Sequence, residues 1–240
     1  MEKDSAGTTG GLDEGEVRAA LDLASPLGDL IALRDAQTGI RHMPTTDRGE
    51  RTFNAILDAA QEVLVEQGLR GITTRKVSDR AGVNIATLYQ YFDDIEAIMM
   101  ALSLRFQIAQ TSLVYERSVE LAMGADFEEW MFALAETLVK QRLENESITA
   151  LIHATRALPY LHEVVNVGWE AGARLFATAL ALREPDQTTE DLLPYTRAAN
   201  SVVRFTLDDT VSSDPFDRDR FELVCRMACD FVSARLTPGA

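Results

Sequence analysis

The sequence is poor in the residues that build metal and redox sites. Only two cysteines and three histidines occur among its 240 residues. Cys225 and Cys229 are four positions apart and would share one face of a helix. None of the histidines (His42, His153 and His162) is close in sequence to another or to a thiol. Because no metal-ligand spacing exists, we predict no metal and no cofactor, and we expect both thiols to be reduced, buried core residues.

Long hydrophobic runs and a leader-like start are also missing. No uncharged apolar run approaches the ~18 residues of a membrane span. The first residues, MEKDSAGTTGGLDEGE, are acidic and small, which is unlike a secretory signal peptide. The composition, 46% hydrophobic and 25% charged, is near the average for globular proteins. We therefore expect a cytoplasmic protein with no membrane partner, built as one large or two modest domains.

Catalytic signatures are equally scarce. The sequence contains no nucleophile elbow, phosphate-binding loop or paired-carboxylate motif. Its acidic residues have the spacing of solvated helix faces. We predict that the protein is not an enzyme.

Basic residues are outnumbered by acidic ones, 23 to 38, which gives a net charge of −15 and argues against a nucleic-acid partner. The charge is unevenly distributed, however. Residues 1–40 carry −5 and residues 93–240 carry −11, whereas residues 41–92 hold seven basic and six acidic side chains. An arginine-rich, nearly neutral segment thus lies inside an acidic protein, and it is the segment best suited to contact phosphates.

Residues 1–46 are rich in Gly, Ser, Thr and Asp and are interrupted by Pro26 and Pro44. This composition predicts a flexible N-terminal extension. Two short helices are the alternative. The residues whose spacing favours them are Val17, Ala20, Leu21 and Ala24, with Ser25–Pro26 as the start of the second helix.

Helical signals become strong from residue 50. One apolar stripe (Phe53, Ile56, Leu57, Ala60, Val63 and Leu64) predicts a helix that ends at Gly68. A second helix, RKVSDRA, would be capped by Thr73 or Thr74. Gly82 then allows a sharp turn with positive φ.

A third and a fourth helix follow that turn. Asn84 is a favourable N-cap for the third, IATLYQYF, and Asp93 would cap the fourth with Glu96 completing a capping box. Two short helices joined by a glycine turn and braced by a longer one form a helix-turn-helix unit, whose second short helix lies in the major groove of DNA.

The third helix has a distinct outward face. Leu88 and Phe92 are four apart and would hold it to the other helices, which leaves outward the residues Ile85, Ala86, Gln90 and Tyr91. A glutamine can pair with adenine, exposed apolar groups can contact a thymine methyl, and tyrosine hydroxyls suit phosphate oxygens. The alternative is that Tyr89 and Tyr91 are half-buried packing residues.

Residues 51–100 resemble the DNA-binding domain of the tetracycline-repressor (TetR) family of transcriptional regulators. The resemblance is carried by AA at 59–60, by GLRGITT and by RAGVNIATLYQYF, followed by the apolar start of the next helix. It implies phosphate contacts from Thr73, Tyr89 and Tyr91, and base contacts from residues 84–90. The full set predicted to bind double-stranded DNA is Arg51, Thr73, Thr74, Arg75, Lys76, Asn84, Ile85, Ala86, Thr87, Tyr89, Gln90 and Tyr91.

The chain departs from the family pattern at two positions. Ile95 stands where the family usually has a lysine, so one expected phosphate contact is missing, and Ser78 replaces a customary alanine. The loss at Ile95 predicts weaker backbone binding or compensation by Arg48, Arg51 or the N-terminal extension.

The larger acidic part, residues 93–240, is predicted to be helical throughout. Helical patterning covers residues 94–122, 127–143, 147–157, 160–183, 189–209 and 217–236, and no convincing strand is found. The fold class predicted is all-α. A flexible extension (1–46) precedes a three-helix helix-turn-helix DNA-binding domain (47–107) and a ligand-binding and dimerisation bundle (108–240).

The last predicted helix is apolar around most of its circumference, so it needs cover on more than one side. We expect it and helix 189–209 to pair with their symmetry mates in a homodimer, as TetR-like proteins do. The interface residues predicted are Val202, Val224, Ala228, Phe231 and Val232. The alternative is a helix buried in a monomer core. A twofold dimer would place two recognition helices about one DNA turn (~34 Å) apart on a palindromic operator.

TetR-like proteins hold an inducer between the DNA-binding unit and the dimer helices. For this region we predict as ligand contacts Trp130, His153, Arg156, Trp169, Asn200 and Arg204. The alternative is that each of these is an ordinary core residue. The function predicted is a homodimeric transcriptional repressor released by an unidentified small-molecule inducer. The alternative function, favoured by Ile95 and the net charge, is an all-helical ligand-binding or scaffolding protein with reduced or lost DNA binding.

Overall fold

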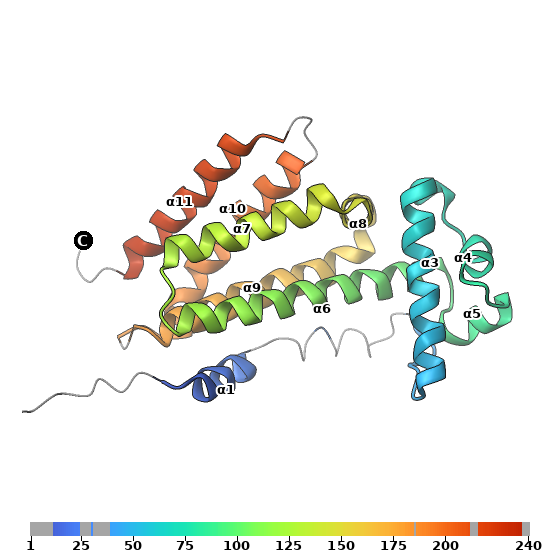
Figure 1. Ribbon diagram of the computed structural model, residues 1–240, viewed down its shortest axis with the longest axis horizontal. Helices are drawn as coiled ribbons and strands as arrows, with labels where there is room; N and C mark the ends of the chain where they lie inside the picture. Colours follow the sequence, from blue (N-terminus) through green and yellow to red (C-terminus); the bar gives the residue numbers. More distant parts are fainter. Residues whose placement is uncertain (1–11, 25–29, 31–38, 185, 212–215, 237–240) are drawn as a thin grey trace, which may run out of the picture.

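The computed structural model describes residues 12–24, 30, 39–184, 186–211 and 216–236, and every regular element within them is helical. A small unit of three helices lies at one end of the molecule, and a larger helical bundle forms the rest (Figure 1). The predicted all-α class with an N-terminal helix-turn-helix unit is therefore confirmed.

The helices agree closely with the periodicity of the sequence. Each helix predicted beyond residue 93 is present, with ends within two residues of the prediction. The helix predicted from residue 160 is preceded by a short 3-10 helix that begins at Pro159. In chain order the elements are α1 (Glu14–Ala24), α3 (Asp47–Gly71), α4 (Thr74–Ala81), α5 (Ile85–Tyr91), α6 (Ile95–Ala122), α7 (Phe127–Glu144), α8 (Glu146–Ala157), η1 (Pro159–Leu161), α9 (His162–Ala181), α10 (Thr189–Val211) and α11 (Arg218–Leu236).

The apolar stripe of α3 forms the centre of the small unit. Ile56 and Ala60 are fully buried, and Leu88 and Phe92 pack against them from the following helices. Gly68 has φ 64° and interrupts the helical backbone where the sequence predicted the helix to end. Helix α8 also contributes Leu151 and Ala154 to this core, so the small unit packs against the bundle.

Helix α6 belongs to both parts of the molecule. Its first turns supply Ile98 and Leu102 to the core of the small unit, and its last turns supply Val119 and Leu121 to the core of the bundle (Figure 1). By length and composition it is apolar enough to cross a membrane, but half of its most apolar window is buried in the protein. Its apolar character is thus accounted for by two protein cores.

The N-cap of α6 is one residue later than predicted. Asp94, not Asp93, accepts a hydrogen bond from the backbone N–H of Ala97, at 2.9 Å. Asp93 instead forms an ion pair with Arg41. Two adjacent aspartates have equal capping propensity, and the partner from the N-terminal segment determines which one caps.

For residues 14–24 the helical alternative holds and the flexible extension does not. These residues form α1, and its Val17 and Leu21 are buried in the core of the bundle. Arg18 donates to both carboxylate oxygens of Glu116 on α6 at about 3 Å. The helix start proposed at Ser25–Pro26 lies outside the described residues.

Residues 39–46 also have partners. Ile40 forms an antiparallel bridge with Phe92, and the N–H of Arg41 donates to the carbonyl of Tyr91 at 2.8 Å. Leu30 is fully buried and packs with Leu104 of α6. We use the name N-terminal strap for α1, Leu30 and residues 39–46, because they run along α6 from the bundle to the end of α5.

The two thiols lie where the sequence predicted. Cys225 and Cys229 are buried on the inner face of α11 and form no disulfide. Burial is the main cause that raises the pKa of both thiols to about 12, and nearby carboxylates add to the effect. Both are therefore protonated, unreactive core residues at neutral pH.

Removal of the buried anchor of α1 should destabilise the whole chain. Leu21 is 0% exposed, whereas Leu23 on the same helix is 92% exposed. Leu21→Ala is expected to lower the free energy of unfolding by about 2–5 kcal/mol, because it leaves a cavity in the core. Leu23→Ala is the matched control and should change it by less than about 0.5 kcal/mol. Urea denaturation followed by circular dichroism measures both, and equal, small effects would show that α1 does not stabilise the bundle.

Candidate nucleic-acid interface and internal cavity

Local capping defines the helix-turn-helix geometry. The Thr73 side chain caps α4 by accepting from the N–H of Lys76, and the Asn84 side chain caps α5 by accepting from the N–H of Ala86. Gly82 between them is left-handed, with φ 65° and ψ 27°. The turn and both caps are thus as predicted, with Thr73 rather than Thr74 as the cap. Leu88 then faces the core, and the opposite side of α5 faces away from the protein.

The outer face of α5 is open. Asn84, Ala86, Tyr89 and Gln90 are exposed. Ile85, Thr87 and Tyr91 are partly buried. The Tyr91 ring packs edge-on against Phe53, with 5.8 Å between the ring centroids. The half-buried alternative therefore applies to Tyr91 but not to Tyr89.

Hydroxyl and cationic groups border this face. The hydroxyls of Thr74 and Tyr89 are 3.2 Å apart, so α4 and α5 present them together. Arg75 forms an ion pair with Asp79 on its own helix. Lys76 donates to the carbonyl of Gly71, and Arg51 is exposed. Within the described residues neither Lys76 nor Arg51 has a carboxylate within 4.0 Å.

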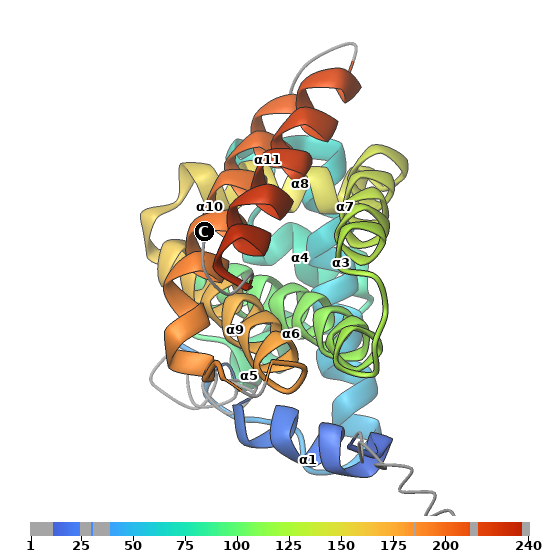
Figure 2. The ribbon, with the colours of Figure 1, turned by 90° about the vertical axis from the view of Figure 1, so that its left-hand side faces the viewer.

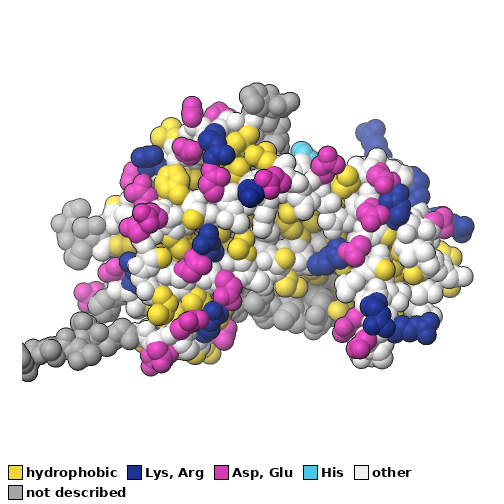
Figure 3. All heavy atoms as spheres, in the orientation of Figure 1, with side chains coloured by type: hydrophobic (Ala, Val, Ile, Leu, Met, Phe, Trp, Pro, Cys, Tyr) yellow, Lys and Arg dark blue, Asp and Glu magenta, His cyan; other side chains and the backbone are white. Residues whose placement is uncertain are grey.

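Arg80 is oriented differently. It donates to Glu62 and Glu66 of α3, and these contacts raise its own pKa and lower the pKa of Glu66. Its charge is thus neutralised within the unit. Figure 3 shows several Lys and Arg side chains along the end of the molecule formed by α3, α4 and α5. The combination of two cations without a carboxylate partner among the described residues, Arg51 and Lys76, with hydroxyls and an amide at this end of the molecule is chemically suited to a phosphodiester backbone and to base edges.

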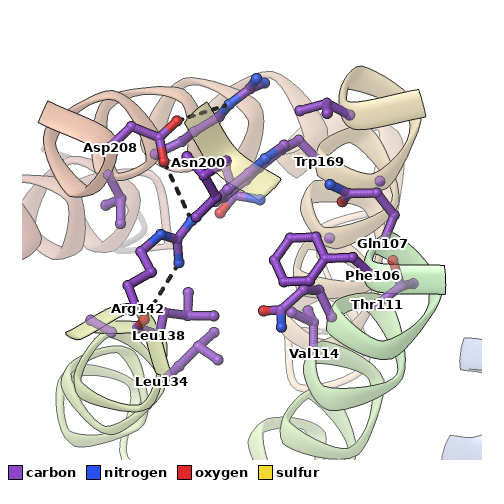
Figure 4. Close-up of a pocket in the computed structure, with 18 of the residues that line it drawn as sticks. Phe106, Gln107, Thr111, Val114, Leu134, Leu138, Arg142, Trp169, Asn200 and Asp208 are labelled. Atoms are coloured by element: carbon purple, nitrogen blue, oxygen red, sulfur yellow. Dashed lines mark hydrogen bonds and ion pairs between the residues drawn. The ribbon is translucent and has the colours of Figure 1, made fainter. Parts of the chain in front are cut away.

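An internal cavity of about 150 Å³ lies between α6, α7, α8, α9 and α10. Its walls are largely apolar and aromatic, with Trp130 and Phe176 among them as well as Phe106, which Figure 4 shows. Its polar lining is formed by Gln107, Gln110, Thr111, Arg142, Thr155, Arg156, His162, Asn200, Arg204 and Asp208.

Charged groups gather at one end of this cavity. Arg142 reaches from α7 towards Asp208 on α10, with 3.4 Å between Nη2 and Oδ1 (Figure 4). Arg204 approaches the other carboxylate oxygen of Asp208 at 3.9 Å and lies over the Trp169 ring. Desolvation is the main cause that lowers the pKa of both guanidinium groups.

The cavity includes most of the ligand contacts predicted from the sequence. Trp130, Arg156, Trp169, Asn200 and Arg204 all line it. The prediction was wrong for His153, which is exposed on α8 and is absent from the cavity wall, and His162 of α9 lines the cavity instead.

The buried arginine was missed, although the sequence carries a signal for it. Leu134, Leu138 and Arg142 are four residues apart, so the arginine continues an apolar stripe of α7. An arginine in that register must be buried with a partner. The partner, Asp208, is 66 residues away in the sequence, and no local pattern links the two.

Helices α10 and α11 lie side by side and present a second, exposed apolar face (Figure 1, Figure 2). The exposed residues on it are Val202, Phe205, Leu223, Met227 and Phe231. This set contains two of the predicted interface residues, Val202 and Phe231. Val224 is partly buried. The assignment of Ala228 and Val232 is corrected, because both are buried within this chain's own core and cannot contact a partner.

Substitution of Gly82 should destabilise the small unit, because the backbone at this position is left-handed. A side chain at Gly82 would meet no atom within 4 Å, so only its φ of 65° disfavours substitution. Gly82→Ala is expected to lower the free energy of unfolding by about 1–2 kcal/mol. Gly82→Asn should lose less, because asparagine tolerates this conformation. Urea denaturation measures both, and an equal loss for Ala and Asn would contradict the backbone explanation.

Comparisons with known proteins agree with this architecture. The family model of bacterial regulatory proteins of the tetR family matches residues 56–102. The uncharacterized HTH-type transcriptional regulators YdeS and YvkB of Bacillus subtilis (strain 168) are 40% and 37% identical over 53 and 51 residues. These segments are 22% and 21% of this chain, and they span only 27% of the length of each relative.

Solved structures extend the likeness to most of the chain at the level of the fold. A TetR-family transcriptional regulator from Streptomyces coelicolor has a TM-score of 0.57 and 19% identity, and the match covers 78% of this chain and 98% of that one. FadR from Bacillus subtilis in complex with stearoyl-CoA has a TM-score of 0.53 and 16% identity, and the match covers 78% of this chain and 100% of that one. RolR in complex with resorcinol has a TM-score of 0.53 and 21% identity, and the match covers 78% of this chain and 95% of that one. Residues 56–102 therefore form a helix-turn-helix domain of the TetR type, and the chain as a whole shares its all-helical fold with TetR-family structures.

Proposed function

We propose that this protein is a cytoplasmic, homodimeric transcriptional repressor that binds a palindromic operator through α5 and is released by a small-molecule inducer. The observation that carries the proposal is the left-handed turn at Gly82, which leaves one face of α5 open while Leu88 anchors the other. An open face of this kind on the second short helix fits the major groove.

The contacts divide into positioning and reading groups. Arg51, Lys76 and Tyr89 would contact phosphates, because they border the face and carry charge or a hydroxyl. Gln90 is exposed and can form two hydrogen bonds with adenine. Ile95, the departure from the family pattern, packs against the core of the small unit and supplies no phosphate contact. Backbone affinity therefore depends on the remaining cations.

The exposed apolar face of α10 and α11 would be covered by a second copy of the chain. Phe205 is 67% exposed and Val202 48% exposed on α10, and on the neighbouring α11 Met227 and Phe231 are 58% and 46% exposed. Exposed apolar patches of this kind mark interaction sites. A twofold pairing across this face would present two copies of α5 to one side of a DNA duplex.

Two helices connect the cavity to the DNA-binding unit. Phe106 of α6 and Leu151 of α8 both line the cavity and pack against the core that holds α5. A ligand that fits better when these side chains are displaced would favour a different setting of α5. Differential binding of that kind typically changes operator affinity by about 1–3 kcal/mol. FadR with stearoyl-CoA and RolR with resorcinol show that ligands of very different size occur on this fold.

Substitutions on the α5 face should weaken operator binding. The operator is first obtained by selecting bound fragments from a genomic DNA pool. Gln90→Ala is expected to lower affinity for it by about 10-fold and to relax sequence preference, because one bidentate base contact is lost. Lys76→Ala should weaken binding to all sequences and reduce the salt slope by about one. Mobility shifts over a range of salt concentrations measure both effects.

The control for Lys76 is Lys140→Ala, since Lys140 is also exposed but lies on α7 in the bundle. It should leave binding unchanged. Wild-type affinity in both Gln90→Ala and Lys76→Ala would show that another surface contacts DNA. Failure of the unmodified protein to bind any DNA at low salt would favour the ligand-binding or scaffolding alternative.

A charge on the α10–α11 face should prevent dimerisation. Phe205→Glu places a carboxylate at the most exposed of these apolar positions and is expected to yield a monomer. Met123→Glu is the control, because Met123 is 49% exposed at the far end of α6. Light scattering after size-exclusion chromatography gives both masses. A dimeric Phe205→Glu variant would rule out this face as the interface.

A further inference from the structure

The charged end of the cavity has more cations than anions. Among the described residues that line the cavity, three are arginines (Arg142, Arg156 and Arg204) and one is an aspartate, Asp208. Glu170 pairs with Arg197 and Asp209 pairs with Arg220, and neither of these carboxylates lines the cavity. The cavity wall therefore carries a net positive charge at this end.

Arg142 is the most buried of these cations, and its own contacts are incomplete. The side chain is only 6% exposed. Its Nη2–Oδ1 distance to Asp208 and its Nη1–O distance to the Leu138 carbonyl are both 3.4 Å, longer than the roughly 2.8 Å of a strong charged hydrogen bond. Its Nε has no hydrogen-bond partner. A buried guanidinium with long contacts and a spare donor can accept one more anion.

A second unpartnered polar atom lines the same cavity. The hydroxyl of Thr111 on α6 is buried, with the residue 2% exposed, and has no partner in the protein. In Figure 4 Thr111, Phe106 and Val114 lie on the side of the cavity opposite Arg142. Between the two ends the walls are apolar, formed by groups such as Leu134 and Leu138. An apolar slot with a cationic end fits an amphipathic anion.

The size and the charge of the site narrow the ligand class. A cavity of about 150 Å³ accommodates a molecule of about one aromatic ring. Asp208 would repel a doubly charged phosphate monoester more than a singly charged group, and a planar carboxylate matches the fork of a guanidinium. A protonated amine would be repelled by the positive charge of the arginines that line this end of the cavity, so an amine is excluded as the ligand class.

We propose that the cavity binds a small organic monocarboxylate of about one ring in size, with its carboxylate on Arg142 and its apolar body between Phe106, Leu134 and Leu138 (Figure 4). The inference deepens the proposed function, because it names the chemical class of the inducer. Arg204 and Asn200 flank the carboxylate position from α10, and Asp208 holds the two guanidinium groups in place.

The two tryptophans provide a direct test that needs no DNA. Trp130 and Trp169 are the only tryptophans of the chain, and both line the cavity. Tryptophan emission therefore reports on occupancy. The full chain is titrated with benzoate, phenylacetate and cyclohexanecarboxylate, with the methyl ester of each acid, and with benzylamine, up to about 10 mM.

At least one acid is expected to change the emission saturably, while its ester and the amine bind at least about 10-fold more weakly. An ester that binds as tightly as its acid overturns the proposal. So does the absence of saturable binding by all three acids. These comparisons use the unmodified protein, so they do not depend on whether a variant folds.

Variants then locate the contact. Arg142→Met is expected to weaken the acid about 10- to 100-fold, and Arg142→Lys to weaken it less, because the charge remains but the fork is lost. Arg218→Met is the control, since Arg218 pairs with Glu136 on the surface away from the cavity. Circular dichroism confirms folding. A folded Arg142→Met variant that keeps wild-type affinity contradicts the assignment.

The two proposals fail in different ways. An acid that binds in the fluorescence titration but leaves operator affinity unchanged supports the ligand class and contradicts ligand-responsive repression. If the protein binds its operator but none of the acids, the result supports the regulatory function and contradicts the proposed ligand class.

Discussion

The burial of α6 in two cores at once is the constraint on which the rest of the molecule depends. Ile98 cannot leave the small unit, and Leu121 cannot leave the bundle, without exposing large apolar surface. At about 25 cal/mol per Å² such exposure is costly, so the helix moves as a rigid connection between the two cores. The cavity lies beside the middle of this helix, at Phe106 and Thr111.

Helical periodicity was sufficient to predict most of the fold. The apolar stripe of α3, the cap at Asn84 and the turn at Gly82 are local features, and local features are visible in one sequence. The failures occurred where a distant partner decides the outcome. Asp94 caps α6 because Arg41 occupies Asp93, and α1 is ordered because the bundle buries Val17. The spacing of Val17 and Leu21 allowed a helix, but nothing in the N-terminal segment shows which surface would bury it.

The candidate site divides in the same way. The open face of α5 follows from the position of Leu88, which the helix period gives directly. The charged end of the cavity depends on Arg142 and Asp208, which only the tertiary structure brings together. On α11 the sequence showed apolar residues around most of the helix, but it could not tell which stripe packs inside. The structure places Val232 inside and leaves Met227 outside.

The N-terminal strap contacts both halves of the molecule, in addition to α6 and α8. Its α1 rests on the bundle through Leu21, and its far end is hydrogen-bonded through Arg41 to the last residue of α5. Helix α5 is thus held at its end by backbone hydrogen bonds as well as through α6. Any rotation of the small unit must disturb the contacts of α6, of α8 and of the strap, so loosening the strap would widen the range of orientations that α5 can sample.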